Sequence, residues 1–329
     1  MTSITVIPRR FRLHRSELAV PASSTQFFEK AARSEADVIF LDLEDAVAPE
    51  RKDEARSLAI RALNDIDWGR RTMVVRVNGL DTEWGYRDIL EVAQSCPRLD
   101  LVLLPKVGGA RDIEFTETLL AGIERSIRRT EPIGIEALIE TALGLANVEA
   151  IAASSARLEA LVFGVGDFII SMQTPDRMVG AINPDYAVLT DPDVQGRRAS
   201  YYNDQWHFAM ARIATACRAY GLRPVDGPYT NFRDEAGFRA SAARARSLGF
   251  DGKWAIHPTQ IGWANEVFTP APEVVRWARR VDAAMREASA AGRGAISLDG
   301  ELIDLAHLKL TRNILDRDDA IRQSRGDRP

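Results

Sequence analysis

Cysteine and histidine are scarce in this sequence. Its 329 residues hold two cysteines, Cys96 and Cys217, and four histidines. Two cysteines cannot build a disulfide framework, and neither has a partner at the spacing of a metal-binding pair. No two of the histidines share a motif, which argues against zinc. The composition therefore excludes a disulfide-stapled domain and disfavours a zinc protein.

Long apolar runs and an excess of basic charge are also missing. No apolar run approaches the roughly 18 residues of a membrane span. The N-terminal segment MTSITVIPRRFRLHR is basic but has no apolar stretch after it, so it does not resemble a secretory signal. The formal net charge of −4 gives no support for nucleic-acid binding, which usually needs a basic surplus. We expect a cytoplasmic protein that binds neither membrane nor nucleic acid.

What the sequence does contain is a recurrent pattern of short apolar runs that end in polar or charged residues. The runs are VIFLDLEDAV (38–47), MVVRVNG (73–79), LVLLPKV (101–107), IEALIET (135–141), LVFGVGD (161–167), RPVDGP (223–228) and KWAIHP (253–258). Continuous Val, Ile and Leu runs are typical of parallel strands that helices cover on both faces. The residues at their ends are Asp42, Glu44, Asp45, Arg76, Lys106, Glu140, Asp167, Asp226 and His257. Because function in such folds gathers at the carboxyl ends of the strands, these residues predict an active-site rim.

The strands alternate with helices along the first four fifths of the chain. The predicted strands are 16–21, 38–43, 72–77, 100–105, 134–139, 160–165, 222–225 and 253–256, and a long connection (171–203) precedes the last helices. Eight strands at a spacing of about 25–35 residues favour a (β/α)8 TIM barrel. The alternative, an open doubly wound sheet, would want a glycine-rich dinucleotide loop after an early strand, and none is present.

The pattern changes beyond residue 270. We therefore predict a barrel domain at 1–269 and a C-terminal lid extension at 270–329. The extension should hold a long helix (273–291), a hairpin, a short helix (305–316) and a frayed charged tail. It can reach over a barrel mouth, its own or a neighbour's; the alternative is a packing appendage without chemistry.

Two carboxylates predict a metal site. Glu140 and Asp167 stand at the ends of predicted strands five and six, and adjacent strands lie roughly 4.8 Å apart. Carboxylates completed by water and substrate oxygens suit Mg²⁺ or Mn²⁺. The alternative for either acid is an ion pair with an arginine of the rim.

Three further rim residues carry competing interpretations. Arg76 has a planar cationic group suited to a carboxylate or thioester oxygen, but it could instead pair with Glu44 or Asp45. Lys106 could form a Schiff base with a carbonyl substrate, although the acidic rim opposes the depressed pKa that this needs. His257 could act as a base or could only hold backbone at the strand end.

Several stretches resemble one known family over nearly the whole chain. They are RSELAVPAS, ADVIFLDLEDAVAPE, RVNGLDT, PKVG, IETALGLANVEAIAASS, GFDGKWAIHPTQI, NEVFTP and GELID. On these residues the chain resembles the citrate lyase β-subunit-like (HpcH/HpaI aldolase) family and, within it, the malyl-CoA lyases. The resemblance implies an Mg²⁺-dependent lyase that cleaves or forms a 3-hydroxyacyl-CoA. Such a reaction converts (S)-malyl-CoA to acetyl-CoA and glyoxylate, or β-methylmalyl-CoA to propionyl-CoA and glyoxylate.

The resemblance also implies roles for individual residues. Glu140 and Asp167 match the Mg²⁺ ligands, Arg76 matches a catalytic substrate contact, and Asp304 matches an acid/base on a lid that covers a neighbouring subunit's site. The remaining substrate-binding positions implied for the CoA thioester and the 2-oxo acid are Arg15, Lys30, Gly166, Asp167, Ile256 and His257. The resemblance, in which neighbouring subunits share the site, also implies a homotrimer or homohexamer.

This sequence departs from the usual family pattern in two loops. Ile169, Ile170 and MQTPDRMVG follow GVGDF, and Tyr229-Thr230-Asn231-Phe232 follows VDGP, so the acyl pocket can be reshaped. Two other activities on the same scaffold stay open, a malyl-CoA thioester hydrolase and a citrate-lyase-type subunit acting on an acyl carrier. A non-catalytic scaffold is disfavoured because the four residues Arg76, Glu140, Asp167 and Asp304 are present.

Overall fold

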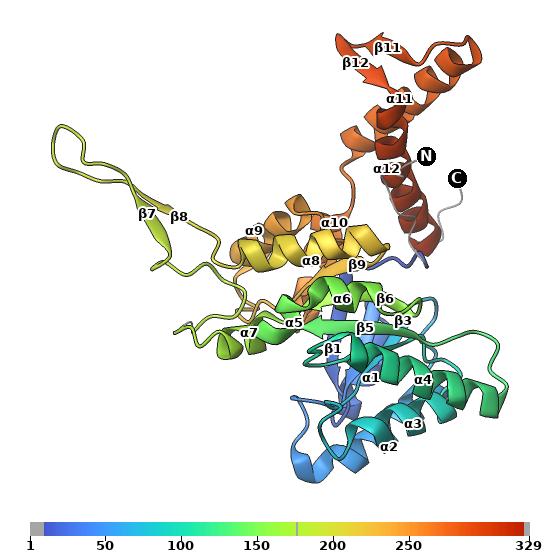
Figure 1. Ribbon diagram of the computed structural model, residues 1–329. Coiled ribbons are helices and arrows are strands. Elements are labelled where there is room, and N and C mark those ends of the chain that lie inside the picture. Colours follow the sequence, from blue (N-terminus) through green and yellow to red (C-terminus); the bar gives the residue numbers. More distant parts are fainter. Residues whose placement is uncertain (1–9, 176, 326–329) are drawn as a thin grey trace. The chain divides into compact units, whose positions relative to one another are not determined.

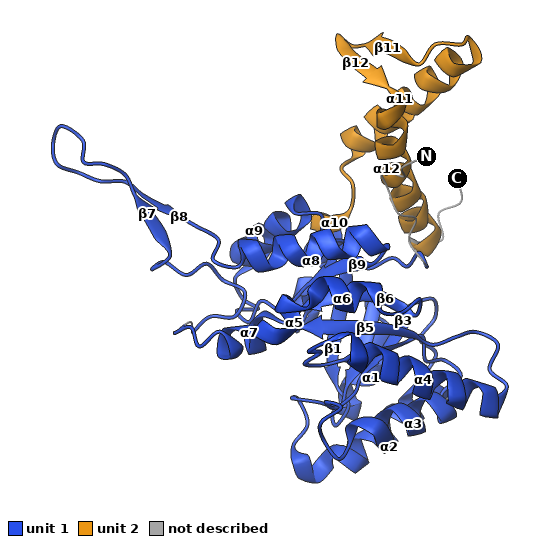
Figure 2. Cartoon of the chain, in the orientation of Figure 1, with its two compact units in different colours: residues 1–265 blue, residues 266–329 orange. Residues whose placement is uncertain are grey.

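The chain forms two compact units. The structure is a computed structural model that describes residues 10–175 and 177–325. One unit comprises residues 1–265 and the other residues 266–329 (Figure 2). Among the described residues, no helix combines the length and the apolar character needed to cross a membrane.

The first unit is built on a closed barrel of eight parallel strands (Figure 1). The strands are β1 (Ser16–Pro21), β2 (Val38–Asp42), β3 (Thr72–Arg76), β4 (Leu101–Leu104), β5 (Gly134–Ile139), β6 (Leu158–Phe163), β9 (Arg223–Asp226) and β10 (Gly252–Ala255). Each strand pairs in parallel with both neighbours, and β1 closes the ring between β2 and β10. The predicted (β/α)8 barrel is confirmed.

Helices follow the barrel strands and cover the ring. They are α1 (Phe28–Ala32), α2 (Lys52–Asp65), α3 (Gly85–Ser95), α4 (Ala110–Ile127), α5 (Ala142–Ala146), α6 (Val148–Ala153), α7 (Val165–Ser171), α8 (His207–Tyr220), α9 (Glu235–Ser247) and α10 (Pro258–Phe268), with single 3-10 turns at Thr25–Phe27 and Pro49–Arg51. Along β2 every residue from Val38 to Leu41 is fully buried, because the barrel interior covers one face and the helices cover the other. That double burial explains the uninterrupted apolar runs of the sequence.

The barrel interior holds an apolar cluster that includes two aromatic rings in contact. The core residues are Val38, Phe40, Val74, Leu101, Leu103, Leu138, Ala160, Val162, Val225 and Trp254. The rings of Phe40 and Trp254 have their centroids 4.6 Å apart. Side chains alternate along each strand, so Val38 and Phe40 point inward while Ile39 and Leu41 meet the helices.

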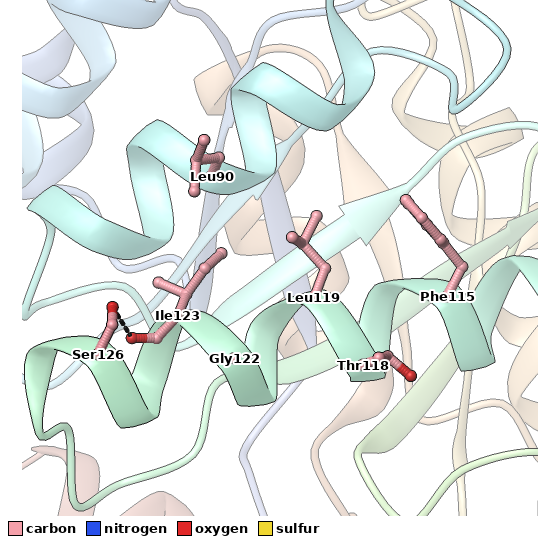
Figure 3. Close-up of a pocket in the computed structure, with 7 residues that line it drawn as sticks. All are labelled: Leu90, Phe115, Thr118, Leu119, Gly122, Ile123 and Ser126. Atoms are coloured by element: carbon pink, nitrogen blue, oxygen red, sulfur yellow. Dashed lines mark hydrogen bonds between the residues drawn. The ribbon is translucent and has the colours of Figure 1, made fainter.

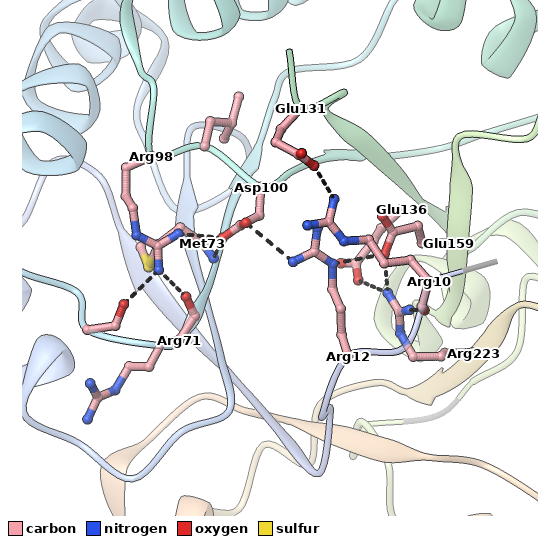
Figure 4. Close-up of polar contacts among 12 residues, drawn as sticks. Arg10, Arg12, Arg71, Met73, Arg98, Asp100, Glu131, Glu136, Glu159 and Arg223 are labelled. Atoms are coloured by element: carbon pink, nitrogen blue, oxygen red, sulfur yellow. Dashed lines mark hydrogen bonds and ion pairs between the residues drawn. The ribbon is translucent and has the colours of Figure 1, made fainter. Parts of the chain in front are cut away.

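Ion pairs tie the strands together at their amino ends (Figure 4). Arg12 contacts Glu159 at 2.9 Å and Asp100 at 3.3 Å, and Arg223 also contacts Glu159, at 3.0 Å. Asp100 in turn accepts a hydrogen bond from the backbone N–H of Met73. In barrels of this type the amino-terminal face serves stability, and this network links β3, β6 and β9 there.

The long connection between β6 and α8 contains a small hairpin that the sequence did not predict. Strands β7 (Ala187–Leu189) and β8 (Ser200–Tyr202) pair antiparallel, with Val188 opposite Tyr201. The predicted strand six also ends earlier than expected, at Phe163, and α7 begins at Val165.

The second unit is a helical hairpin with a two-stranded sheet. It contains α11 (Pro272–Ala290), β11 (Ala295–Leu298), β12 (Glu301–Asp304) and α12 (Leu305–Arg325). Asp299 and Gly300, with φ of 54° and 85°, form the two-residue turn between the strands, as Asp-Gly favours. Val281, Met285 and Ile303 form the core of the unit.

The predicted end of the last helix at residue 316 was wrong. Helix α12 continues to Arg325 through the charged stretch. Asp318 accepts from Arg322 one turn later, at 2.9 Å, and from Arg279 of α11, at 3.1 Å. Ile321 is buried, so this charged stretch of α12 still contributes an apolar side chain to the packing of the helix.

Candidate active site

An arginine held by two acids lies at the carboxyl ends of β2 and β3. Arg76 donates from Nε and Nη2 to the two carboxylate oxygens of Asp42, each at 2.7 Å, and its Nη1 lies 2.9 Å from Glu44. Its guanidinium also lies 5.6 Å from the ring centroid of Trp254. Burial disfavours the charged form, but Asp42 and Glu44 outweigh it and raise the pKa of Arg76. The predicted ion pair with Glu44 is present, and Arg76 is a fixed positive charge.

Lys106 joins acids from the segments that follow β2, β5 and β6. Its ammonium contacts Glu44, and lies 3.2 Å from Asp167 and 3.6 Å from Asp45. Its backbone N–H donates to Oε1 of Glu140 at 2.7 Å. Burial acts to lower the pKa of this lysine, but the hydrogen bond to Glu44 and the surrounding acids raise it above its usual value. A protonated lysine is a poor nucleophile, which disfavours the Schiff-base mechanism.

Glu140 is the most deeply buried acid of this group. It follows β5 directly and is 3% exposed. Burial, followed by the negative charges of Asp167 and Glu44, raises the pKa of Glu140 to about 8. Gly164 makes room for it, since a Cβ on Gly164 would lie 2.4 Å from Oε2 of Glu140. The positive charges of Lys106 and Arg76 therefore offset the effect of burial on the pKa of Glu140 only in part.

Asp167 lies in the first turn of α7, and the expectation that it ends strand six is corrected. The strand stops at Phe163, and Gly164 and Val165 carry the chain into the helix. A carboxylate in the first turn of a helix is favoured by the free N–H groups and the helix dipole. Gly166 precedes Asp167 in the same turn. Asp167 therefore remains at the mouth of the barrel, beside Lys106.

The acids of this cluster fit a hard divalent cation. Glu44, Asp45 and Asp167 each offer one carboxylate oxygen, and these oxygens lie within 4.8 Å of one another. Glu140 interacts with Asp167 and Glu44 by charge. A donor set of carboxylate oxygens, without histidine or cysteine, is the set that Mg²⁺ prefers. Glu44 and Asp45 were predicted as residues of the active-site rim and as partners of Arg76, but not as cation ligands; the run LEDAV after strand two was the signal for that wider role.

The loop after β10 places Ile256 and His257 at the same end of the barrel. The imidazole of His257 stacks on Phe232, with centroids 4.6 Å apart and planes 17° apart, and its Nδ1 lies 2.9 Å from Oγ1 of Thr259. The backbone N–H of Ile256 donates to Gln260 at 2.8 Å, while its side chain is 38% exposed. The stacked imidazole and the exposed Ile256 side chain form a surface at the strand ends.

The structure does not bring Arg15 and Lys30 into this group. Arg15 precedes β1, so it lies at the amino ends of the strands, where its side chain is paired with Asp37 at 2.8 Å. A residue before a strand and a residue after it lie at opposite ends of the barrel, which speaks against a role for Arg15 beside the acids. Lys30 is exposed on α1.

Asp304 belongs to the second unit and ends β12. Its Oδ1 lies 2.8 Å from Nδ1 of His307 and accepts from the backbone N–H of Ala306 at 2.9 Å. The contact with His307, then the N–H of Ala306, lowers the pKa of Asp304. The carboxylate is therefore held ionised and oriented at the start of α12.

A groove on the outside of the barrel is chemically different from this site (Figure 3). It has a volume of about 480 Å³ and lies between α3, which carries Leu90, and α4, which carries its other lining residues. Those residues are Phe115, Thr118, Leu119, Gly122, Ile123 and Ser126. None of them titrates, so the groove offers no acid, base or metal ligand.

Residues 15–258 match the family model described as HpcH/HpaI aldolase/citrate lyase. The chain belongs to this family. The predicted family resemblance is confirmed, and the chain is an enzyme of the aldolase and lyase type.

Two relatives of this HpcH/HpaI family chain are named for different activities on malyl-CoA. It is 47% identical over 299 residues to an L-malyl-CoA/β-methylmalyl-CoA lyase of Cereibacter sphaeroides, covering 91% of this chain and 92% of the relative. It is 37% identical over 310 residues to a (3S)-malyl-CoA thioesterase of Cereibacter sphaeroides, covering 93% and 95%. Among solved structures, CitE of Mycobacterium tuberculosis in complex with magnesium, acetoacetate and coenzyme A has 28% identity and a TM-score of 0.68, covering 93% and 98%.

Proposed function

We propose that this protein is an Mg²⁺-dependent carbon–carbon lyase acting on a 3-hydroxyacyl-CoA. The substrate class is (S)-malyl-CoA, cleaved to acetyl-CoA and glyoxylate, with β-methylmalyl-CoA giving propionyl-CoA and glyoxylate. The observation that supports this most is the carboxylate cluster around Lys106, with Arg76 beside it, in a chain 47% identical to a lyase of that name.

The cation would be held by the acids at the strand ends. Glu140 and Asp167 are the proposed ligands, with Glu44 and Asp45 close enough to take part. When bound, Mg²⁺ (or Mn²⁺) would supply Lewis-acid polarisation and a template for substrate oxygens. A magnesium complex of a CitE protein in the same family supports this assignment.

Arg76 would stabilise the negative charge that develops as the carbon–carbon bond breaks. Cleavage needs loss of the hydroxyl proton of the substrate and leaves the electron pair on the carbon next to the thioester. Because Asp42 and Glu44 fix its guanidinium, Arg76 needs no reorganisation to face that charge. Its fork has five N–H donors in all, so donors remain for a substrate oxygen.

Asp304 would exchange the proton at the acyl-CoA carbon. Asp304 ends β12. His307 and the N–H of Ala306 contact one oxygen of its carboxylate, which leaves the other oxygen for this task. We propose further that the residue covers the site of a neighbouring copy in a homotrimer or homohexamer. The segment GELID, which resembles the family lid, supports this role.

The substrate itself would lie over the loops that follow the strands. Gly166, Ile256 and His257 are the proposed contacts of the CoA thioester and the 2-oxo acid, and Lys30 is a further candidate for the CoA. The exposed side chain of Ile256 and the stacked imidazole of His257 support a surface that receives a ligand. A cytoplasmic location remains part of the proposal.

A thioester hydrolase is the second candidate, and it rests on the 37% identity to a (3S)-malyl-CoA thioesterase. One assay separates the two. The purified protein is incubated with (S)-malyl-CoA, with and without Mg²⁺, and glyoxylate and free thiol are followed separately. Glyoxylate with acetyl-CoA, only when metal is present, supports the lyase. Free CoA with malate supports the hydrolase. The absence of both sets of products would overturn malyl-CoA as the substrate.

A further inference from the structure

Lys106 stands among the acids that would bind the cation. Its ammonium contacts Glu44 and lies 3.2 Å from Asp167 and 3.6 Å from Asp45, and these three acids are the ones whose oxygens converge within 4.8 Å. A lysine ammonium is a compact point charge with three donors, so it can satisfy several carboxylates at once. In this structure the positive charge at the centre of the cluster comes from the chain itself.

The backbone of Lys106 is held in an unusual conformation to achieve this. Its φ is +53°, in the left-handed region that residues with a Cβ avoid. The same conformation directs the backbone N–H to Glu140 at 2.7 Å. Glycine would adopt this φ freely and could make the same N–H bond. The ammonium is therefore the part of Lys106 that a glycine could not replace.

A divalent cation and this ammonium would compete for the same carboxylates. Mg²⁺ binds carboxylate oxygens at about 2.1 Å. A cation on Asp167 would thus lie within a few ångströms of an ammonium that is itself 3.2 Å from that side chain. Like charges at such a separation repel strongly in a partly buried site. This repulsion favours an arrangement in which the ammonium moves off Asp167 when a cation binds there.

We propose that Lys106 is a tethered competitor of the divalent cation: its ammonium holds Asp167 and Glu44 together before the cation binds and is displaced from Asp167 when the cation arrives. The residue is a positioning residue, because it acts on the ligands of the cation. It keeps the acids from repelling one another and lowers the affinity for the cation, so that cation binding remains reversible. The inference rests on the proposed function, since it takes the cation site from there.

The proposal is tested by the affinity for Mn²⁺ and Mg²⁺, measured by isothermal titration calorimetry on the full chain without substrate. Lys106→Met removes the charge at similar size, and Lys106→Gly removes it while keeping the N–H to Glu140. Both should bind Mn²⁺ at least about tenfold more tightly than the wild type. Lys106→Arg should keep the wild-type affinity. Lys309→Met is the matched control, since Lys309 is exposed in the second unit.

Each outcome decides the matter. Tighter binding in both charge-removing variants supports the proposal, and so does binding that only those variants show. If the wild type binds Mn²⁺ and either charge-removing variant fails to bind it more tightly, the competition is wrong while the cation site stands. If no protein of the series binds Mn²⁺, the competition and the proposed cation site fail together. Tightening in Lys309→Met as well would reduce the effect to net charge and overturn the role of Lys106.

Discussion

The geometry of Arg76 makes it sensitive to a change that preserves its charge. Its two hydrogen bonds to Asp42 and its contact with Glu44 use the planar fork of the guanidinium. Lysine offers a point charge in place of that fork, so it cannot hold the same direction. We expect Arg76→Lys to lower kcat on (S)-malyl-CoA by about 10²–10³-fold. The Mn²⁺ affinity should change by only a few-fold. Steady-state kinetics and calorimetry measure the two effects, and an unaltered kcat would contradict the proposed role.

Replacement of Asp167 should abolish cation binding as well as turnover. It is a proposed cation ligand with its side chain 26% exposed, so removing it takes away a ligand without opening the core. Asp167→Ala is expected to abolish metal-dependent turnover and Mn²⁺ binding while the thermal unfolding midpoint stays within a few degrees of the wild type. Glyoxylate release is followed in excess Mg²⁺ and in excess chelator. Undiminished turnover in chelator, in the wild type, would refute the metal mechanism.

Asp304 is tested by separating turnover from cation binding. Its proposed task is the proton exchange at the acyl-CoA carbon, and the cation ligands belong to the other unit. Asp304→Ala should therefore lower kcat by about 10²–10⁴-fold, the range for loss of a general acid or base. The Mn²⁺ affinity should match the wild type. A normal kcat would mean that the hairpin and the Asp304 carboxylate have a packing role and no part in the reaction.

At the scale of elements, the close approach of β5 and β6 depends on Gly164. A Cβ at this position would lie 2.4 Å from Oε2 and 2.5 Å from Cβ of Glu140. Gly164→Ala should push Glu140 aside, weaken Mn²⁺ binding and destabilise the protein by about 1–3 kcal/mol. Gly166→Ala is the matched control for these two readouts, since its Cβ would meet Val179 at 3.8 Å, an ordinary contact. Equal effects of both substitutions would show that crowding of Glu140 is not the cause.

The elements also show what the sequence could predict and what it could not. Apolar runs ending in Arg76 and Glu140 located these residues correctly, because strand burial and strand ends are local features. The end of β6 was misplaced, since Val165 continues the apolar run although it begins a helix. The meeting of Lys106 with Glu44 was not predictable from spacing. It needs the closed ring and the left-handed backbone at Lys106, and both arise only from the folded chain.

At the scale of the whole molecule, the barrel buries a second acidic pair away from the cation site. Glu17 of β1 and Glu136 of β5 are fully buried, and no described donor bonds to either oxygen of Glu136. His14 contacts Glu17 at 3.0 Å, and the indole N–H of Trp254 donates to the same carboxylate at 2.8 Å. Arg223 is 3.8 Å from Glu136. The pair therefore lies inside the barrel with little compensation for two negative charges.

Burial raises the pKa of both acids, to about 8 for Glu136 and about 7 for Glu17, and for Glu136 the charge of Glu17 adds to it. The folded protein thus holds a proton there that the unfolded chain, with ordinary glutamates, releases near pH 4.5. The native state binds more protons between these pH values, so the free energy of unfolding should fall as the pH rises from about 5 to 8. The contribution should level off about one pH unit above the pKa of Glu136.

Glu136→Gln separates this pair from the other titrating groups of the chain. Glutamine is neutral at every pH and can donate an N–H to Glu17, so it imitates the protonated acid. Urea unfolding at pH 5.5 and 8.5 should show the wild type losing about 2 kcal/mol more than the variant over this interval. Glu149→Gln is the control, because Glu149 is an exposed acid and should leave the pH dependence of the wild type intact. Parallel pH profiles for the wild type and Glu136→Gln would mean that the buried pair is ionised in the fold, and that the barrel compensates both charges.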